Sequence, residues 1–219
     1  MASSPRAPIR VDIVSDVVCP WCAIGYLQLA RAAETLGLAI DVHWHPFELN
    51  SQMAMEGEKL FDHLARKYGI TPAQSQQNRT QITQLGAELG FTFAFSDDMF
   101  MWNTFRAHQL IEWAEEQDRA HDAKLALLAA HFTDRRNVSD QDTLADIARD
   151  IGLDRQGALD MLNAGTHAES VRKKQAFWTS QGVQGVPAMI FAQRYAATGA
   201  QGVAGYRRIL ENLMTDQVA

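Results

Sequence analysis

Cys19-Pro20-Trp21-Cys22 is the stretch that decides the fold, because it holds both cysteines of the 219-residue chain and separates them by two residues. A Cys-x-x-Cys pair can form and break a small disulfide, and the thiolate is its reactive form. The apolar run 9–14 predicts a strand before the pair, and a helical pattern after it ends at Gly37. Pro20 suits a first helical turn. The spacing therefore predicts a redox site at a helix N-terminus, where free N–H groups favour a negative sulfur on Cys19.

A zinc site is the alternative for the two cysteines. Structural zinc usually takes four protein ligands, and the chain has no third cysteine. His43 and His45 alternate along a predicted strand and share one face, so this alternative requires a Cys2His2 cluster. We favour the redox interpretation and expect no metal.

Composition and charge bound the class of protein. A chain of 219 residues with 47% hydrophobic residues can form one large domain, or a domain with an inserted subdomain. The net charge of −6 gives no electrostatic footprint for nucleic acid or an anionic membrane. Residues 1–10 lack the apolar region of a signal peptide, and no run reaches transmembrane length. We therefore expect a cytoplasmic protein without nucleic-acid or membrane partners, whose disulfide is catalytic and transient.

Two separate parts of the sequence carry the pattern of one sheet. Residues 39–49 predict a second strand, which completes a right-handed βαβ unit with the cysteines at the carboxyl end of its first strand. Helical periodicity then runs from about residue 58 to residue 181, before strands near 188–193 and 195–198 and a last helix over 201–214. We predict an α/β fold in the order β-α-β, a large all-helical insertion, and β-β-α. Residues 1–56 and 182–219 would form one domain, and residues 57–181 a helical subdomain.

This order resembles a thioredoxin fold with a helical insertion, as in the DsbA family, over nearly the whole chain. One difference is Ala23, because family members often carry an aromatic residue after the second cysteine. Four stretches are similar to the FrnE-like cytosolic branch of the family: Ser15-Asp16 leading into Cys19–Gly25, Trp44–Leu49, Asn103-Thr104 with Ala107-His108, and Gly182–Ala188 followed by Thr198–Gln201.

The resemblance implies a role for each cysteine and for one proline. Cys19 would be the exposed nucleophile, Cys22 the resolving thiol, and Val186-Pro187 a cis-proline loop facing the disulfide. Such a loop turns the chain so that the Val186 backbone can pair with an extended substrate beside Cys19. A proline that merely opens a strand is the other interpretation of Pro187.

Three residues near the pair are candidates for tuning it. Asp16 is either a carboxylate that tunes the thiol or a turn residue that bonds its own backbone. Pro20 and Trp21 lie between the cysteines and are expected to shift the relative stability of thiolate and disulfide.

Two further residues are candidates for binding a substrate. Trp44 is expected either in an apolar groove for substrates or in the core. Gln201 is expected in a glutathione site next to Val186. We interpret His108 as an interface histidine with satisfied hydrogen bonds.

We expect an enzyme, a protein disulfide oxidoreductase or isomerase without a bound cofactor. Its substrates would be disulfide- or dithiol-containing proteins or small molecules, with glutathione or a thioredoxin system as partner. A second hypothesis is a glutathione-binding enzyme of the kappa-class transferase or 2-hydroxychromene-2-carboxylate isomerase type, although those proteins typically have serine at the position of Cys19. A third is a chaperone-like binder whose disulfide is a redox sensor.

Overall fold

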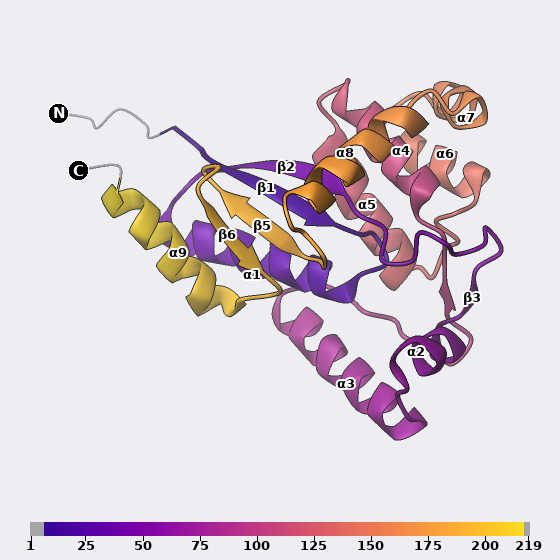
Figure 1. The fold of residues 1–219 in the computed structure, drawn as a ribbon, viewed down its shortest axis with the longest axis horizontal. Helices are drawn as coiled ribbons and strands as arrows, with labels where there is room; N and C mark the ends of the chain where they lie inside the picture. The colour runs from indigo at the N-terminus through magenta and orange to yellow at the C-terminus, as the bar shows by residue number, and fades with distance from the viewer. Residues whose placement is uncertain (1–6, 217–219) are drawn as a thin grey trace.

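The computed structural model describes residues 7–216. Within this range one four-stranded sheet has the order β2-β1-β5-β6 (Figure 1). Its strands are β1 (Ile9–Ser15), β2 (Ile40–Pro46), β5 (Ala188–Phe191) and β6 (Tyr195–Thr198). β1 pairs in parallel with β2 and antiparallel with β5, which pairs antiparallel with β6. The two distant parts of the sequence thus complete one sheet, and the predicted β-α-β and β-β-α order is confirmed.

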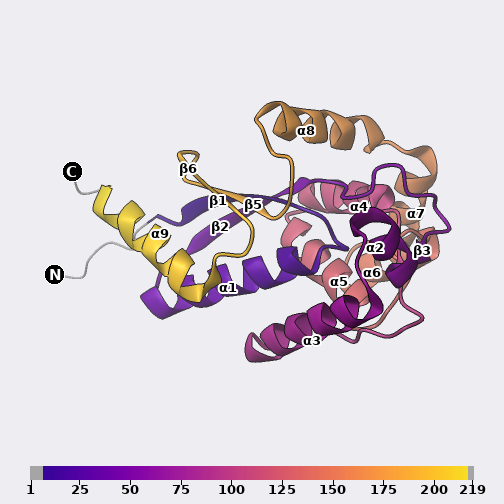
Figure 2. The same ribbon diagram turned by 60° about the horizontal axis from the view of Figure 1, so that its bottom comes forward.

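Helices lie on both sides of this sheet. α1 (Pro20–Leu36) and α9 (Gly202–Asp216) pack together on one face, whereas α8 (Ala168–Ser180) lies on the other side against β2 (Figure 2). As predicted, α1 begins at Pro20 and ends at Gly37, which has the left-handed conformation with φ 62°. Cys19 therefore lies where the carboxyl end of β1 meets the N-terminus of α1.

Helices make up most of the insertion between β2 and β5. They are α2 (Leu60–Tyr68), α3 (Pro72–Glu88), α4 (Phe105–Glu115), α5 (Ala120–Phe132), α6 (Gln141–Asp150), α7 (Arg155–Ala164) and α8. The insertion also contains a short antiparallel ladder between β3 (Glu58–Lys59) and β4 (Phe100–Met101). The sequence did not predict this ladder, because two-residue strands leave no alternating pattern. Among the described helices, none combines the length and apolar character needed to cross a membrane.

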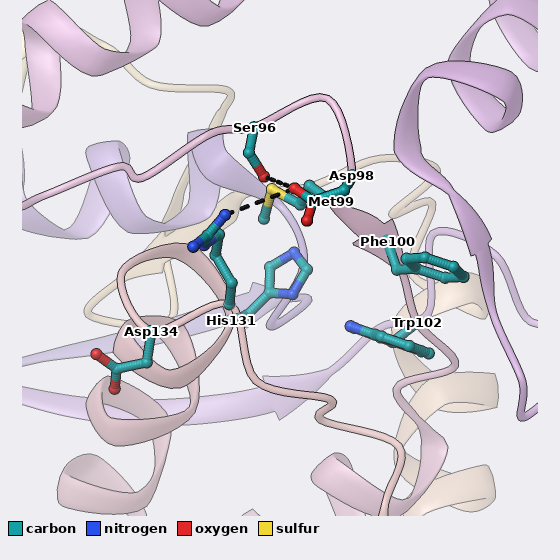
Figure 3. Close-up of a pocket in the computed structure, with 8 residues that line it drawn as sticks. Ser96, Asp98, Met99, Phe100, Trp102, His131 and Asp134 are labelled. Atoms are coloured by element: carbon teal, nitrogen blue, oxygen red, sulfur yellow. Dashed lines mark hydrogen bonds and ion pairs between the residues drawn. The ribbon is translucent and has the colours of Figure 1, made fainter.

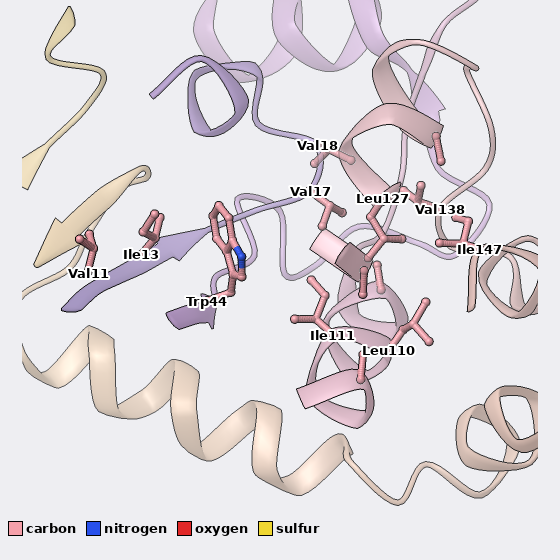
Figure 4. Packing of buried hydrophobic residues seen from close by; sticks show 14 of the residues in the cluster. Val11, Ile13, Val17, Val18, Trp44, Leu110, Ile111, Leu127, Val138 and Ile147 are labelled. Atoms are coloured by element: carbon pink, nitrogen blue, oxygen red, sulfur yellow. The ribbon is translucent and has the colours of Figure 1, made fainter. Parts of the chain in front are cut away.

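The hydrophobic core continues from the sheet into the insertion (Figure 4). Ile13 of β1 and Trp44 of β2 belong to the same buried cluster as Leu110 of α4 and Leu127 of α5. Each large apolar side chain buried there contributes about 1.5–3 kcal/mol, so the sheet and the insertion stabilise each other. The domain boundaries at residues 57 and 181 stay a prediction.

Candidate active site

The two cysteines lie at the start of α1 in unequal surroundings. Cys19 directly precedes the helix in an extended conformation, and the Cys22 N–H donates to its carbonyl oxygen over 3.1 Å. Both are free thiols; Cys22 is fully buried and Cys19 is 4% exposed. The expectation of an exposed nucleophile is therefore wrong. Cys19 lies in the wall of a recess, because α2 and α3 of the insertion supply the facing wall.

The loop before β5 faces Cys19. The Val186–Pro187 peptide bond is cis, as predicted, and the Cys19 Sγ lies 3.8 Å from the Val186 carbonyl oxygen, to which it donates. Gly25 allows α1 to approach this loop closely, since a Cβ on Gly25 would lie 3.2 Å from both Pro187 Cγ and Met189 Cε. The close approach of the cis-proline loop to the two cysteines thus requires glycine at position 25.

Asp16 is fully buried at the end of β1. Its carboxylate accepts hydrogen bonds from Val17 N over 2.7 Å and Leu49 N over 2.8 Å, and His108 Nε2 lies 3.3 Å from Oδ1. Burial acts to raise the pKa of Asp16. The hydrogen bonds from His108 and Leu49 and the charge of Lys124 outweigh burial, so this pKa lies below its usual range. Asp16 is therefore an ionised group that also fixes the turn after β1.

A buried cation from the insertion lies near the redox pair. Lys124 of α5 is 1% exposed, and its Nζ lies 5.4 Å from the centroid of the Trp44 ring. Burial lowers the pKa of Lys124, whereas Cys22, Asp16 and Cys19 act in the opposite direction. Burial and the neighbouring Cys19 raise the pKa of the Cys22 thiol, and Lys124 opposes them. When it is protonated, Lys124 therefore favours a thiolate in this apolar environment.

The contacts of His108 and Lys124 in this site were not predicted from the sequence. His108 Nε2 lies 2.9 Å from the Phe47 carbonyl oxygen as well as near Asp16, so this nitrogen carries a proton shared between two acceptors. The interpretation of His108 as an interface histidine with satisfied hydrogen bonds fits its contact with the Phe47 carbonyl oxygen. It did not include the contact with Asp16. Lys124 did leave a signal, because it shares a helix face with Leu127 and Leu128 in an otherwise apolar run.

The structure separates the other predicted site residues. Pro20 and Trp21 line the recess, and the Trp21 side chain is 38% exposed. Trp44 lies in the core instead, because β2 turns its ring toward α1, where it packs 5.3 Å from Tyr26. Trp44 is therefore not part of this recess.

Gln201 lies in the turn between β6 and α9. Its side-chain amide donates to the Thr198 carbonyl oxygen over 2.7 Å and remains exposed. The same turn is tied to the cis-proline loop, since Gly199 N donates to the Pro187 carbonyl oxygen over 2.7 Å. A role for Gln201 in binding glutathione stays a prediction.

The two histidines of the zinc alternative are used elsewhere. His43 is hydrogen-bonded to Asp41, and His45 to Asp12, each over 2.8 Å. Within residues 7–216, no group of three or more His, Cys, Asp and Glu side chains is arranged to hold a metal ion. The Cys2His2 cluster is therefore not formed.

The recess beside Cys19 has a volume of about 430 Å³. Its walls come from the start of α1, from α2 and α3, from the end of α5 and from Val186. His131 of α5 lines this recess and a second one of about 270 Å³, where it lies near the Ser96–Asp98 hydrogen bond (Figure 3). Burial lowers the pKa of His131 to about 4, so the ring is neutral at pH 7.

A dithiol at a helix N-terminus, opposite a cis-proline loop on a four-stranded sheet, defines a thioredoxin-fold redox protein. Residues 10–211 match the DSBA-like thioredoxin domain family, and the chain belongs to that family of thiol–disulfide oxidoreductases.

Known proteins similar to this chain include two solved structures. A probable DsbA oxidoreductase from Streptomyces coelicolor is 27% identical, with a TM-score of 0.85 over 93% of this chain and 89% of that one. The cytosolic disulfide reductase DsbM from Pseudomonas aeruginosa, solved with GSH, shares the fold at 16% identity, with a TM-score of 0.64 over 94% and 99% of the two chains. The uncharacterized protein YwbO of Bacillus subtilis (strain 168) is 24% identical over 211 residues, which are 95% of this chain and 97% of YwbO.

Proposed function

We propose that this protein is a cytoplasmic thiol–disulfide oxidoreductase of the reductase or isomerase type, from the FrnE-like branch of its family. The observation that carries the proposal is the position of Cys19 at the N-terminus of α1, beside the Val186 carbonyl, with a second thiol buried one turn further on. Cys19 lines the recess and meets the substrate first, and burial protects Cys22 until it is needed.

The reaction proceeds by two thiol–disulfide exchanges. The Cys19 thiolate attacks one sulfur of a substrate disulfide, forms a mixed disulfide and releases the other sulfur as a thiolate. The Cys22 thiolate then attacks the Cys19 sulfur, which releases the second substrate thiolate and forms the Cys19–Cys22 disulfide. The two protons of the enzyme dithiol end on the two released thiols. The substrate is thus reduced by two electrons and the enzyme is oxidised by two.

Buried charged groups near the two cysteines assist the second exchange, in which Cys22 attacks the mixed disulfide. Lys124 favours the Cys22 thiolate electrostatically, and ionised Asp16 in turn supports the protonated form of Lys124. His108 holds the Asp16 carboxylate in place. We propose glutathione or a thioredoxin system as the thiol reductant that returns the enzyme to the dithiol state. The GSH in the structure of DsbM supports the first of these reductants.

The redox proposal differs from its two competitors in what Cys22 does. In an enzyme of the kappa-class transferase or 2-hydroxychromene-2-carboxylate isomerase type, the residue at the position of Cys19 activates the glutathione thiol. Such an enzyme needs no second cysteine. A chaperone-like binder needs no turnover at all. The placement of Cys22 one turn after Cys19 favours the oxidoreductase.

Trapping with cysteine variants tests the proposal, because the chain has only these two cysteines. Cys22→Ser should accumulate a stable mixed disulfide on Cys19 when mixed with oxidised glutathione or with a protein that carries scrambled disulfides, detected as a mass increase that dithiothreitol removes. Cys19→Ser should show neither the adduct nor turnover, and the double serine variant serves as the control. Full disulfide-reductase turnover by Cys22→Ser would contradict the scheme.

A further inference from the structure

The recess beside Cys19 limits what can reach the reactive sulfur. Cys19 is 4% exposed, so a disulfide must enter the recess before its sulfur can meet the Cys19 Sγ. The volume of about 430 Å³ falls within the range of about 300–1,000 Å³ that is typical of small-molecule sites. A disulfide on the surface of a folded protein carries its neighbouring backbone with it, which such a recess does not accommodate.

The walls of the recess are mostly apolar. Leu64 of α2, Ile82 of α3, Phe95 and Phe132 all contribute to the lining. Such a surface favours aromatic or branched aliphatic groups, which release water when they are buried. A ligand that fills it therefore has an apolar body.

One full charge faces this apolar space. Among the described residues that line the recess, Arg79 is the only Asp, Glu, Lys or Arg. Its guanidinium donates to Asp97 and to Gln76, each over 3.0 Å, and its Nε is buried without a partner in the described part of the chain. The Asp97 side chain is 97% exposed, so this ion pair is weak and leaves Arg79 able to bind an anion.

We infer that the substrate is a low-molecular-weight disulfide with an apolar body and an anionic group, and that Arg79 binds that group. The inference rests on the proposed function and adds the substrate class. Cys19 and Cys22 together reduce one such disulfide to two thiols and become a disulfide themselves. A soluble thiol reductant then restores the dithiol with its own two electrons and protons. Arg79 acts as a positioning residue, whereas the electrons come from the cysteines.

Two matched aromatic disulfides test the role of Arg79. 2,2′-Dithiodipyridine and 6,6′-dithiodinicotinate both release a thione that absorbs in the near ultraviolet, and only the second carries carboxylates. We expect Arg79→Gln to lower the ratio of kcat/KM for the carboxylated probe to that for the uncharged probe by about tenfold, mainly through KM. Arg66→Gln is the control, since Arg66 is an exposed arginine on α2 outside the recess and should leave the ratio at its wild-type value.

A second variant tests the recess itself. Leu64 is half-buried in the wall, so Leu64→Trp narrows the space without opening the core. We expect it to slow both small probes by at least about tenfold while the equilibrium of the cysteine pair with dithiothreitol is unchanged.

The outcomes separate the substrate class from the proposed function. A wild-type dithiol that leaves both probes intact overturns the proposed function, and the substrate class with it. A wild-type protein that reduces both probes, with a ratio insensitive to Arg79→Gln, overturns the substrate class alone. Reduction of insulin faster than both probes, undiminished by Leu64→Trp, also overturns the substrate class and leaves the oxidoreductase in place.

Discussion

The Nε2 of His108 lies 3.3 Å from Asp16 Oδ1 and 2.9 Å from the Phe47 carbonyl oxygen. A single N–H on α4 therefore binds both a buried carboxylate at the end of β1 and the backbone that follows β2. Because the Asp16 carboxylate is fully buried, water cannot replace this donor if it is lost. The insertion, through α4, thus fixes the position of Asp16 and of the backbone at Phe47 near the two cysteines.

The His108 contact predicts a loss of stability on truncation. We expect His108→Ala to lower the free energy of unfolding by about 2–4 kcal/mol, because it leaves a buried carboxylate short of a donor. Urea unfolding measures the change. Gln109→Leu is the control on the same helix, since the buried Gln109 Oε1 has no partner among the described residues, and its effect should stay below about 1 kcal/mol. Equal losses from both variants would contradict a specific role for His108.

Lys124 predicts a change in redox equilibrium. A positive charge stabilises the dithiol state, in which a thiolate can form, more than the uncharged disulfide. Lys124→Met should therefore make the reduction potential of the pair more negative by about 30 mV, which corresponds to about 1.4 kcal/mol for a two-electron couple. Equilibration with dithiothreitol buffers measures it. Lys174→Met is the control, because Lys174 pairs with Glu112 and Glu115 away from the cysteines. An unchanged potential in Lys124→Met would show that this lysine does not act on the thiols.

The parts of the site that are close in the sequence were predictable. The cysteine pair, the start of α1 at Pro20 and the end at Gly37 follow from local rules about proline, glycine and apolar spacing. The cis-proline loop was predictable only through the family resemblance. Lys124 and Arg79 were not found, because their positions depend on how α5 and α3 pack against α1. A helical pattern in one sequence does not reveal which helix a given face will meet.

Cys19 and Trp44 show the same limit. Cys19 was expected to be exposed, and Trp44 was expected either in a substrate groove or in the core; burial by distant elements decided both. Cys19 is covered because α2 and α3 form the facing wall of the recess, and Trp44 because it packs between α1 and α5. In both cases the residue type fitted either environment, so only the tertiary contacts decide between them.

Gly25 predicts a steric effect at the cis-proline loop. In Gly25→Ala the new methyl group would lie 3.2 Å from both Pro187 Cγ and Met189 Cε, closer than ordinary contact. We expect a loss of about 1–3 kcal/mol in unfolding free energy and a slower reaction of Cys19 with disulfides. Gly185→Ala in the same loop is the control, since a Cβ there meets nothing within 4 Å. Its stability should remain within about 0.5 kcal/mol of wild type. If the two variants behave alike, close packing of α1 against this loop is not required.

His131 predicts that the protein loses stability in mild acid. Its pKa is lowered to about 4 in the folded protein by burial, whereas the unfolded chain has the ordinary histidine value of about 6.5. Between these values the unfolded chain binds more protons, so the stability rises with pH in this window and falls on acidification. The contribution of His131 is fully present above about pH 6.5, and about 2 kcal/mol of it should be lost between pH 7 and pH 4.5.

Urea unfolding of wild type and His131→Asn over this range measures the effect, and the variant should show a shallower dependence on pH. His43→Asn is the control: His43 is half-buried on the sheet, pairs with Asp41 and does not line the recess, so this variant should retain the wild-type slope. A slope that is unchanged in His131→Asn would mean that His131 already gains a proton in the folded state near pH 6.5, and the buried neutral ring would then be the wrong description of this wall.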